Sequence, residues 1–171
     1  HFYSGKIKFL VNDLLMHIKP LAPVFLPINK YGSQAKESSL QINNAYESDE
    51  QMLIFPAGLC SRLQHGKIKD LEWKKTFIAK AVQSQRDIIP IYFEGRNSTF
   101  FYRFAQIRKC IGLKFNIELI YLPDEMFNSK NKTFDIYIGK PIPWQTFDKS
   151  KSLQEWAQIV KEKVYQIKKN Q

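Results

Sequence analysis

The sequence has few cysteines and no long apolar stretch. Its two cysteines, Cys60 and Cys110, show no metal-ligand spacing and form no disulfide framework, so we expect a reducing compartment. No apolar run approaches the roughly eighteen residues that a membrane span requires, and no signal peptide is visible. An initiating methionine is also lacking, because the chain begins at His1, and we expect a domain truncated at its N-terminal side.

Acidic residues are scarce relative to basic ones. Lys and Arg total 26 and Asp and Glu total 16, which gives a net charge of +10 at pH 7. Such an excess predicts a polyanionic partner, either nucleic acid, an anionic membrane surface or a phosphorylated substrate. With 44% hydrophobic and 14% aromatic residues, the chain can bury a substantial core, and its 171 residues fit one domain over residues 1–171.

Short apolar runs alternate with amphipathic segments along the chain. The apolar runs predict strands at 6–11, 22–28, 51–55, 88–93 and 134–139. Helical periodicity predicts helices at roughly 35–47, 71–83, 98–111 and 153–167, while 115–122 fits either a strand or a helix. This order predicts an α/β domain with a mostly parallel or mixed sheet flanked by helices. We therefore expect the chemistry at three turns that follow strands, at 29–34, 56–66 and 94–99.

Two of these turns contain residues suited to binding an anion. In Phe-Pro-Ala-Gly-Leu-Cys-Ser-Arg, Gly58 permits a sharp bend, Ser61 offers a hydroxyl group and Arg62 offers a planar guanidinium group. Arg96 precedes a predicted helix, whose N-terminal N–H groups attract anions. A solvated loop with an unengaged arginine is the alternative for each turn.

His65 and Asp70 have the composition of a general base and the carboxylate that orients it. Residues five apart do not share a helix face, and in a strand they point to opposite sides. The pair works only across a turn, which His65 followed by Gly66 permits. Chance occurrence of this spacing is a rival explanation. Cys60 is a separate candidate, either as a thiolate nucleophile or as a buried, unreactive cysteine.

Several of these segments together resemble the glycerolipid, or lysophospholipid, acyltransferases, most closely their hemolysin-like and ornithine-lipid bacterial branch. The family's block Phe-Pro-Glu-Gly-Thr-Arg-Ser is similar to residues 55–62, followed here by Gly66 and by Trp73-Lys74-Lys75. Its preceding block resembles 24–30, and its following block, a proline within an apolar strand, resembles 88–92. The resemblance implies a glycerol-3-phosphate acyltransferase-like fold and acyl transfer from an acyl-carrier-protein or acyl-CoA thioester to a lysolipid hydroxyl, without a cofactor or metal.

The family's first block, His-x-x-x-x-Asp, supplies its general base and precedes all the others. This sequence has no such block before residue 24. Its only match to the pattern, His65 to Asp70, follows the block at residues 55–62 instead. We therefore expect the catalytic pair to lie outside this chain, and the chain alone to lack turnover. His65 and Asp70 remain the catalytic candidates within it. Ala57 and Cys60 stand where the family usually has Glu and Arg, which favours an acceptor other than a glycerol phosphate, such as a lyso-aminolipid.

The resemblance also implies a set of substrate-binding residues and a location. The residues expected to contact substrate are Asn29, Lys30, Phe55, Pro56, Gly58, Ser61, Arg62, Pro90 and Arg96. Residues 100–115 interleave aromatic and basic side chains, which is typical of a helix lying on an anionic membrane surface, although Phe101, Phe104 and Ile111 also suit the core. We expect a peripheral protein at the cytoplasmic face of the inner membrane.

Three alternatives stay open at this point. A non-catalytic module that binds lipid surfaces would share the fold and the basic helices. A nucleic-acid-binding domain would use the same charge and aromatic residues, but no nucleic-acid motif is present and we expect no nucleic-acid partner. A thiol enzyme would form a covalent intermediate on Cys60.

Overall fold

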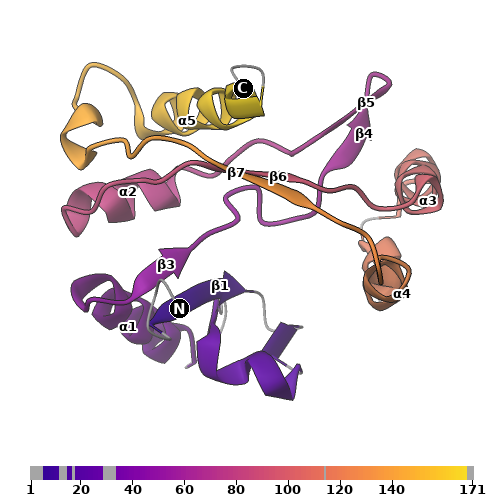
Figure 1. Cartoon of the computed structure of the whole chain (residues 1–171), viewed down its shortest axis with the longest axis horizontal. Coiled ribbons are helices and arrows are strands. Elements are labelled where there is room, and N and C mark those ends of the chain that lie inside the picture. Colours follow the sequence, from indigo (N-terminus) through magenta and orange to yellow (C-terminus); the bar gives the residue numbers. More distant parts are fainter. Residues whose placement is uncertain (1–5, 12–14, 17, 29–33, 114, 169–171) are drawn as a thin grey trace.

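In the part of the chain that the structure describes, three parallel strands are followed by two antiparallel strand pairs, with helices between them (Figure 1). The computed structural model describes residues 6–11, 15–16, 18–28, 34–113 and 115–168. The α/β prediction is therefore confirmed, and both parallel and antiparallel pairings occur.

The parallel sheet is built from the N-terminal third of the chain. It consists of β1 (Ile7–Val11), β2 (Phe25–Pro27) and β3 (Gln51–Leu53) in the order β2-β1-β3. A 3₁₀ helix, η2 (Lys19–Val24), leads into β2, and α1 (Gln34–Glu47) connects β2 to β3. The strand predicted over 22–28 is therefore shorter than expected, because two prolines suit the 3₁₀ turn that occupies its first half.

A hairpin and a helix follow β3. The hairpin strands β4 (Arg62–Gln64) and β5 (Lys67–Lys69) are antiparallel, and His65 and Gly66, with φ of 49° and 76°, form the tight turn between them. The sequence reasoning missed this hairpin. The next helix, α2 (Thr76–Gln83), begins five residues later than predicted. Residues 71–75 are not helical, and their backbone bonds to other segments, as when Lys74 N–H donates to the carbonyl of Pro56.

The second antiparallel pair consists of β6 (Ile91–Glu94) and β7 (Asp135–Ile138). Between these strands lie α3 (Thr99–Cys110), the 3₁₀ helix η3 (Ile117–Tyr121) and α4 (Leu122–Phe127). The ambiguous segment 115–122 is thus mainly 3₁₀ helix. In Figure 1, α3 and α4 lie together at one end of the molecule, beyond β6 and β7.

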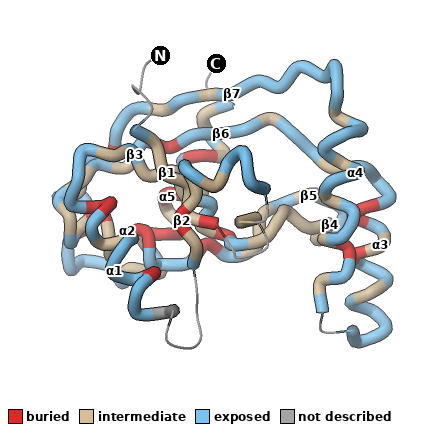
Figure 2. Tube along the Cα trace, turned by 90° about the horizontal axis from the view of Figure 1, so that it is seen from below, coloured by how far each residue is buried: buried red, intermediate tan, exposed pale blue. Residues whose placement is uncertain are grey.

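The hydrophobic core lies where α2 packs against the C-terminal helix, α5 (Leu153–Ile167), with the short η4 (Trp144–Thr146) beside them. Ser152 and Glu155 form a capping box that starts α5. Its buried residues Ala157, Val160 and Val164 recur at helical spacing and meet Phe77 and Ile78 of α2. Figure 2 shows these buried residues gathered near the centre, whereas β7 and α4 are mostly exposed. The core positions the segment after β3, because Ala57 and Trp73 belong to it.

Candidate functional site

The segment Phe55–Arg62 leaves the parallel sheet at the carboxyl end of β3 and turns sharply at Gly58. Gly58 N–H donates to the carbonyl of Phe55 at 2.9 Å, and Gly58 has φ of 68°, which glycine adopts without strain. A Cβ atom at Gly58 would lie 2.9 Å from Lys74 Nζ, so the lysine ammonium group lies over the turn. Phe55 is 62% exposed, whereas Ala57 is buried in the core. The turn therefore presents its outer side to solvent while Ala57 anchors it.

Ser61 is held by Asp70, which lies just beyond the end of the β4–β5 hairpin. The Ser61 hydroxyl group donates to Asp70 Oδ1 at 2.5 Å, and Trp73 Nε1 donates to Asp70 Oδ2 at 3.1 Å. The backbone N–H of Asp70 donates to the hydroxyl oxygen of Tyr165 on α5. Both carboxylate oxygens of Asp70 are thus engaged by its own chain, and the carboxylate serves to fix the base of the hairpin.

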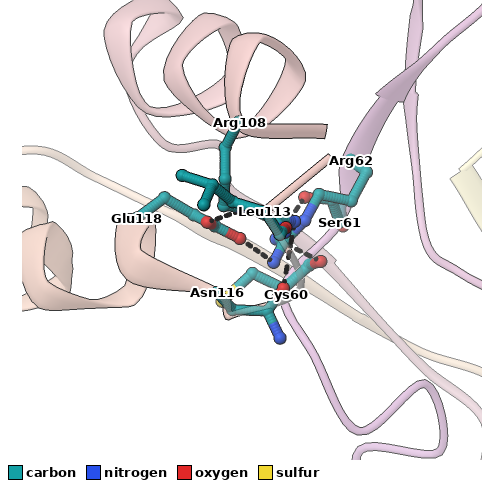
Figure 3. A network of polar contacts seen from close by, with 7 residues as sticks. All are labelled: Cys60, Ser61, Arg62, Arg108, Leu113, Asn116 and Glu118. Atoms are coloured by element: carbon teal, nitrogen blue, oxygen red, sulfur yellow. Dashed lines mark hydrogen bonds and ion pairs between the residues drawn. The ribbon is translucent and has the colours of Figure 1, made fainter. Parts of the chain in front are cut away.

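Arg62 takes part in a buried ionic triad with Glu118 and Arg108 (Figure 3). Arg62 Nη2 donates to Glu118 Oε1 at 2.7 Å, and Arg108 Nε lies 2.8 Å from Glu118 Oε2 without directing its N–H at that oxygen. The Glu118 side chain is fully buried, and the two arginine side chains are each 12% exposed. A buried carboxylate without a cation would be costly, so the two guanidinium groups stabilise Glu118 and leave the triad with a net charge of +1.

The remaining contacts of the triad fix the backbone around it. Arg62 Nη1 donates to the carbonyl of Cys60 at 2.9 Å and to that of Ser61 at 3.3 Å. Arg108 Nη1 donates to the carbonyl of Leu113 at 2.5 Å. The Arg62 guanidinium carbon lies 5.7 Å from the centre of the Phe101 ring on α3. Arg62 therefore ties the end of the turn to α3 and η3, and most of its donors are already engaged.

The turn between β6 and α3 already holds an anion from the same chain. Ser98 caps α3 by accepting from the N–H of Phe101, and its own N–H and hydroxyl group donate to the carboxylate of Glu125 on α4. A carboxylate at a helix N-terminus is favourable because the N–H groups there are unpaired. Arg96, in contrast, is exposed, and its Nη2 donates to Thr99 Oγ1 at 3.4 Å. Arg96 is thus the cation of this turn that faces solvent.

The structure does not form a dyad from His65 and Asp70. His65 is exposed at the tip of the hairpin, and the three residues of β5 separate the turn from Asp70 by roughly 10 Å. The Asp70 carboxylate contacts Ser61 and Trp73 instead. Burial raises the pKa of the Cys60 thiol group, and the positive charge of Arg62 opposes that effect only in part. A raised pKa reduces the thiolate fraction that a nucleophilic cysteine requires.

Comparison with known proteins assigns the chain. A family model described as Acyltransferase matches residues 2–171. The chain belongs to this acyltransferase family. It is 57% identical over 165 residues to a lyso-glycine lipid O-acyltransferase of Bacteroides thetaiotaomicron, and 54% identical over 165 residues to one of Phocaeicola vulgatus. These matches cover 96% of this chain but 61% and 59% of the two relatives, so the chain spans about three-fifths of their length. No solved structure matches.

For an acyltransferase-family chain, the environment of Ala57 is informative. The family block that residues 55–62 resemble usually has Glu at this position, whereas here the side chain is 9% exposed and lies in the apolar cluster with Trp73 and Phe77. A glutamate in this place would lose its hydration without gaining a partner among those residues. The local packing therefore accounts for the alanine.

The other expected substrate-binding residues are not gathered in one cavity. Pro56 is half-buried, and Pro90 is buried beside Gly139, whose N–H donates to its carbonyl. Pro90 lines a cavity of about 300 Å³ with residues of 139–143 and α5, and a cavity of about 390 Å³ lies between the C-terminal ends of α1 and α2; neither contains a residue of the 55–62 segment. Asn29 and Lys30 lie outside the described residues. Among the described residues, no His, Cys, Asp and Glu side chains cluster as a metal site, and no helix has the length and apolarity needed to cross a membrane.

Three residues that matter for this site were missed by the sequence reasoning. Glu118 and Arg108 complete the triad, and Lys74, noted only within Trp73-Lys74-Lys75, covers Gly58. A glutamate inside the apolar run Ile-Glu-Leu-Ile-Tyr was the available indication, because a buried carboxylate requires a cationic partner. The identity of that partner, 56 residues away in the case of Arg62, required the fold.

Proposed function

We propose that this chain contributes to an O-acyltransferase that transfers a fatty acyl group from an acyl-carrier-protein or acyl-CoA thioester to the hydroxyl group of a lysolipid. The observation that carries the proposal is the 57% identity over 165 residues to a lyso-glycine lipid O-acyltransferase, with the family match over nearly the whole chain. Neither a purely structural lipid-binding module nor a nucleic-acid-binding domain is favoured by relatives of this kind. A lyso-glycine lipid is the acceptor that we propose.

The exposed cations beside the turns support an acceptor with an anionic head group. Arg62, which the sequence favoured for this role, is engaged by Glu118 and by backbone carbonyls. Lys74, over Gly58, and Arg96, before α3, are exposed, and neither is paired with a carboxylate within the described part of the chain. We assign head-group recognition to these two cations and a scaffolding role to Arg62.

The chemical step requires a base that takes the proton of the acceptor hydroxyl group as its oxygen attacks the thioester carbonyl carbon. The carbon–sulfur bond then breaks, and the thiol leaves with the proton returned by the base. The described residues place no histidine beside the 55–62 segment, since His65 lies at the hairpin tip. The sequence also has no His-x-x-x-x-Asp block before residue 24, so we propose that the base lies outside this chain and that the chain alone has no turnover. The lipid acceptor implies a peripheral location, which we propose to be the cytoplasmic face of the inner membrane.

A chimera provides the test. The 165 matched residues of the Bacteroides thetaiotaomicron relative are replaced by those of this chain, and the purified chimera is incubated with a thioester donor and lyso-glycine lipid. We expect an acylated product by mass spectrometry. A folded chimera that forms none, beside an active parent, would refute the proposal.

The same assay tests the assignment of the head-group cations. Replacing Lys74 or Arg96 by Gln should raise the KM for the lysolipid about tenfold, which corresponds to roughly 1.4 kcal/mol of lost binding free energy. Lys75 is also exposed but is not the lysine that covers Gly58, so Lys75→Gln is the matched control and should leave the KM unchanged. Equal effects of all three substitutions would show a general charge effect instead.

A further inference from the structure

Helix α3 exposes a continuous apolar stripe to solvent. Phe100, Phe104, Ile107 and Ile111 follow one another at steps of four and three residues, which places them on one side of the helix. Phe100, Ile107 and Ile111 are 55%, 58% and 66% exposed. The buried residues of α3, which are Phe101, Tyr102 and Ala105, lie on a different side of the helix. The sequence left open whether Phe101 and Ile111 face the core or a membrane surface. Phe101 is buried in the protein, whereas Ile111 is exposed.

The stripe continues onto η3. The Phe100 and Phe104 rings stack at 5.8 Å, and the ring of Tyr121 meets both edge-on, at 5.3 and 5.5 Å between centroids. On the same 3₁₀ helix, Ile120 is 75% exposed. We call these six residues, Phe100, Phe104, Ile107, Ile111, Ile120 and Tyr121, the α3–η3 face. Contiguous exposed apolar surface of this kind marks an interaction site rather than ordinary protein surface.

The charges around the α3–η3 face are mainly basic. Arg103 is exposed on α3 four residues before Ile107, Arg96 precedes the helix, and α3 has no acidic residue. The acidic residue of η3, Glu118, is buried and neutralised by two arginines. Exposed acidic charge nearby comes from Asp124 on α4, and Lys130 and Lys132 follow that helix. The surface therefore combines apolar area with positive charge.

A second exposed apolar surface provides an internal comparison. Ile91 and Phe93 of β6 lie opposite Ile138 and Ile136 of β7, and all four are exposed. The two strands contain no basic residue, and their charged residues, Glu94 and Asp135, point to the other face of the pair, where Glu94 is bound by Lys168. Of these two surfaces, only the α3–η3 face combines exposed apolar area with the positive charge that a negatively charged partner requires.

We propose that the α3–η3 face docks on the anionic surface of a lipid bilayer, with its apolar side chains among the acyl chains and its basic side chains at the phosphate groups. The inference deepens the proposed function, because a lysolipid acceptor resides in a bilayer. Amphipathic segments with aromatic and aliphatic side chains on one side and Lys or Arg beside them bind such interfaces. In Figure 1, α3 lies at one end of the molecule, where it can approach a flat surface.

Vesicle flotation tests the docking surface, with the 171-residue chain and no acyl donor present. Vesicles contain phosphatidylglycerol and phosphatidylcholine, or phosphatidylcholine alone. The test variant is Ile107→Ser/Ile111→Ser. The matched control is Ile136→Ser/Ile138→Ser, because these two isoleucines are each 61% exposed, similar to the 58% and 66% of the test pair. We expect the test variant to partition about tenfold more weakly, since each isoleucine forgoes roughly half the transfer free energy of a buried side chain. The control should bind like the unaltered chain.

A charge variant completes the test. Arg103→Gln should weaken binding to the anionic vesicles about fivefold and reduce its salt dependence, since a basic residue near an anionic surface contributes about 1 kcal/mol. All the substituted side chains are exposed, so each variant should melt at the same temperature as the unaltered chain, which verifies that it folds. The proposal would be overturned if the test variant floated as well as the unaltered chain, or if the control variant lost binding equally. It would also be overturned if the test substitutions disrupted a dimer of the chain and left vesicle binding intact. In the chimera, acyl transfer to detergent-dispersed lysolipid should survive Ile107→Ser/Ile111→Ser, which separates failed docking from failed catalysis.

Discussion

Glu118→Gln is the substitution that probes the triad most selectively. Gln keeps the shape of the side chain and an oxygen that Arg62 Nη2 can still donate to at the position of Oε1. It removes the negative charge between two guanidinium groups, and with its oxygen facing Arg62 it places an N–H₂ group 2.8 Å from Arg108 Nε. The arginine side chains are each only 12% exposed, so water replaces little of the lost interaction.

The magnitude follows from the burial of the three groups. Removing one partner of a buried ion pair costs about 3–5 kcal/mol, because the remaining charge is left desolvated and uncompensated. The residual hydrogen bond to Arg62 places the expected loss at the lower end, about 3 kcal/mol. For a chain of this size each kcal/mol lowers the melting temperature by about 2–4 °C, so the expected decrease is roughly 6–12 °C.

Circular dichroism melting of the purified chain measures the effect. Glu94→Gln is the control, because Glu94 pairs with Lys168 at the surface, where the two side chains are 38% and 45% exposed. An exposed pair contributes at most about 1 kcal/mol, so this variant should melt within a few degrees of the unaltered chain. If Glu118→Gln melts no lower than Glu94→Gln, the triad does not anchor Arg62, and the scaffolding role assigned to that residue is wrong.

Three further predictions concern single side chains. Burial raises the pKa of Tyr46 from 10.0 to about 12, and Arg86 opposes the shift only in part, so the unfolded chain ionises first and stability is lost as the pH rises from 10 to 12. Tyr46→Phe should lose less stability over that interval in alkaline melting, and equal losses would contradict the assignment. His65→Asn keeps a residue type that tolerates positive φ and should leave acyl transfer by the chimera unchanged; a tenfold or greater loss would restore His65 as a catalytic residue. Near neutral pH, maleimide should modify the exposed Cys110 before Cys60, whose pKa is raised by burial, with one label per native chain and two after denaturation; equal rates for the two thiols would contradict this.

The elements that the sequence predicted well are those with a strong local pattern. Helix α5 has apolar residues at helical spacing and a capping box from Ser152, and β1 is a short apolar run, so both follow from local sequence. The β4–β5 hairpin was missed because its strands have three residues each and contain mostly polar side chains, a pattern too short for periodicity to indicate. The His65-Gly66 turn was recognised as a possible bend but not as a hairpin.

The candidate site was harder to predict because its contacts join distant parts of the chain. Arg62 has the composition of an anion-binding residue, and only the fold shows that its anion is Glu118. The N-terminus of α3 likewise attracts an anion, as helix physics predicts, and that anion is Glu125 of the same chain. The family, in contrast, was correctly predicted from three ordered blocks of sequence, and comparison confirms it.

The linkage of the transferred acyl group tests the central claim most directly. Lyso-glycine lipid is incubated with the chimera and a thioester donor, and the product is weighed by mass spectrometry before and after mild alkaline hydrolysis. The account predicts a gain of one acyl group that mild base removes, as expected for an ester on a hydroxyl oxygen. A product whose added acyl group survives mild base, or no added acyl group beside an active parent enzyme, would contradict it.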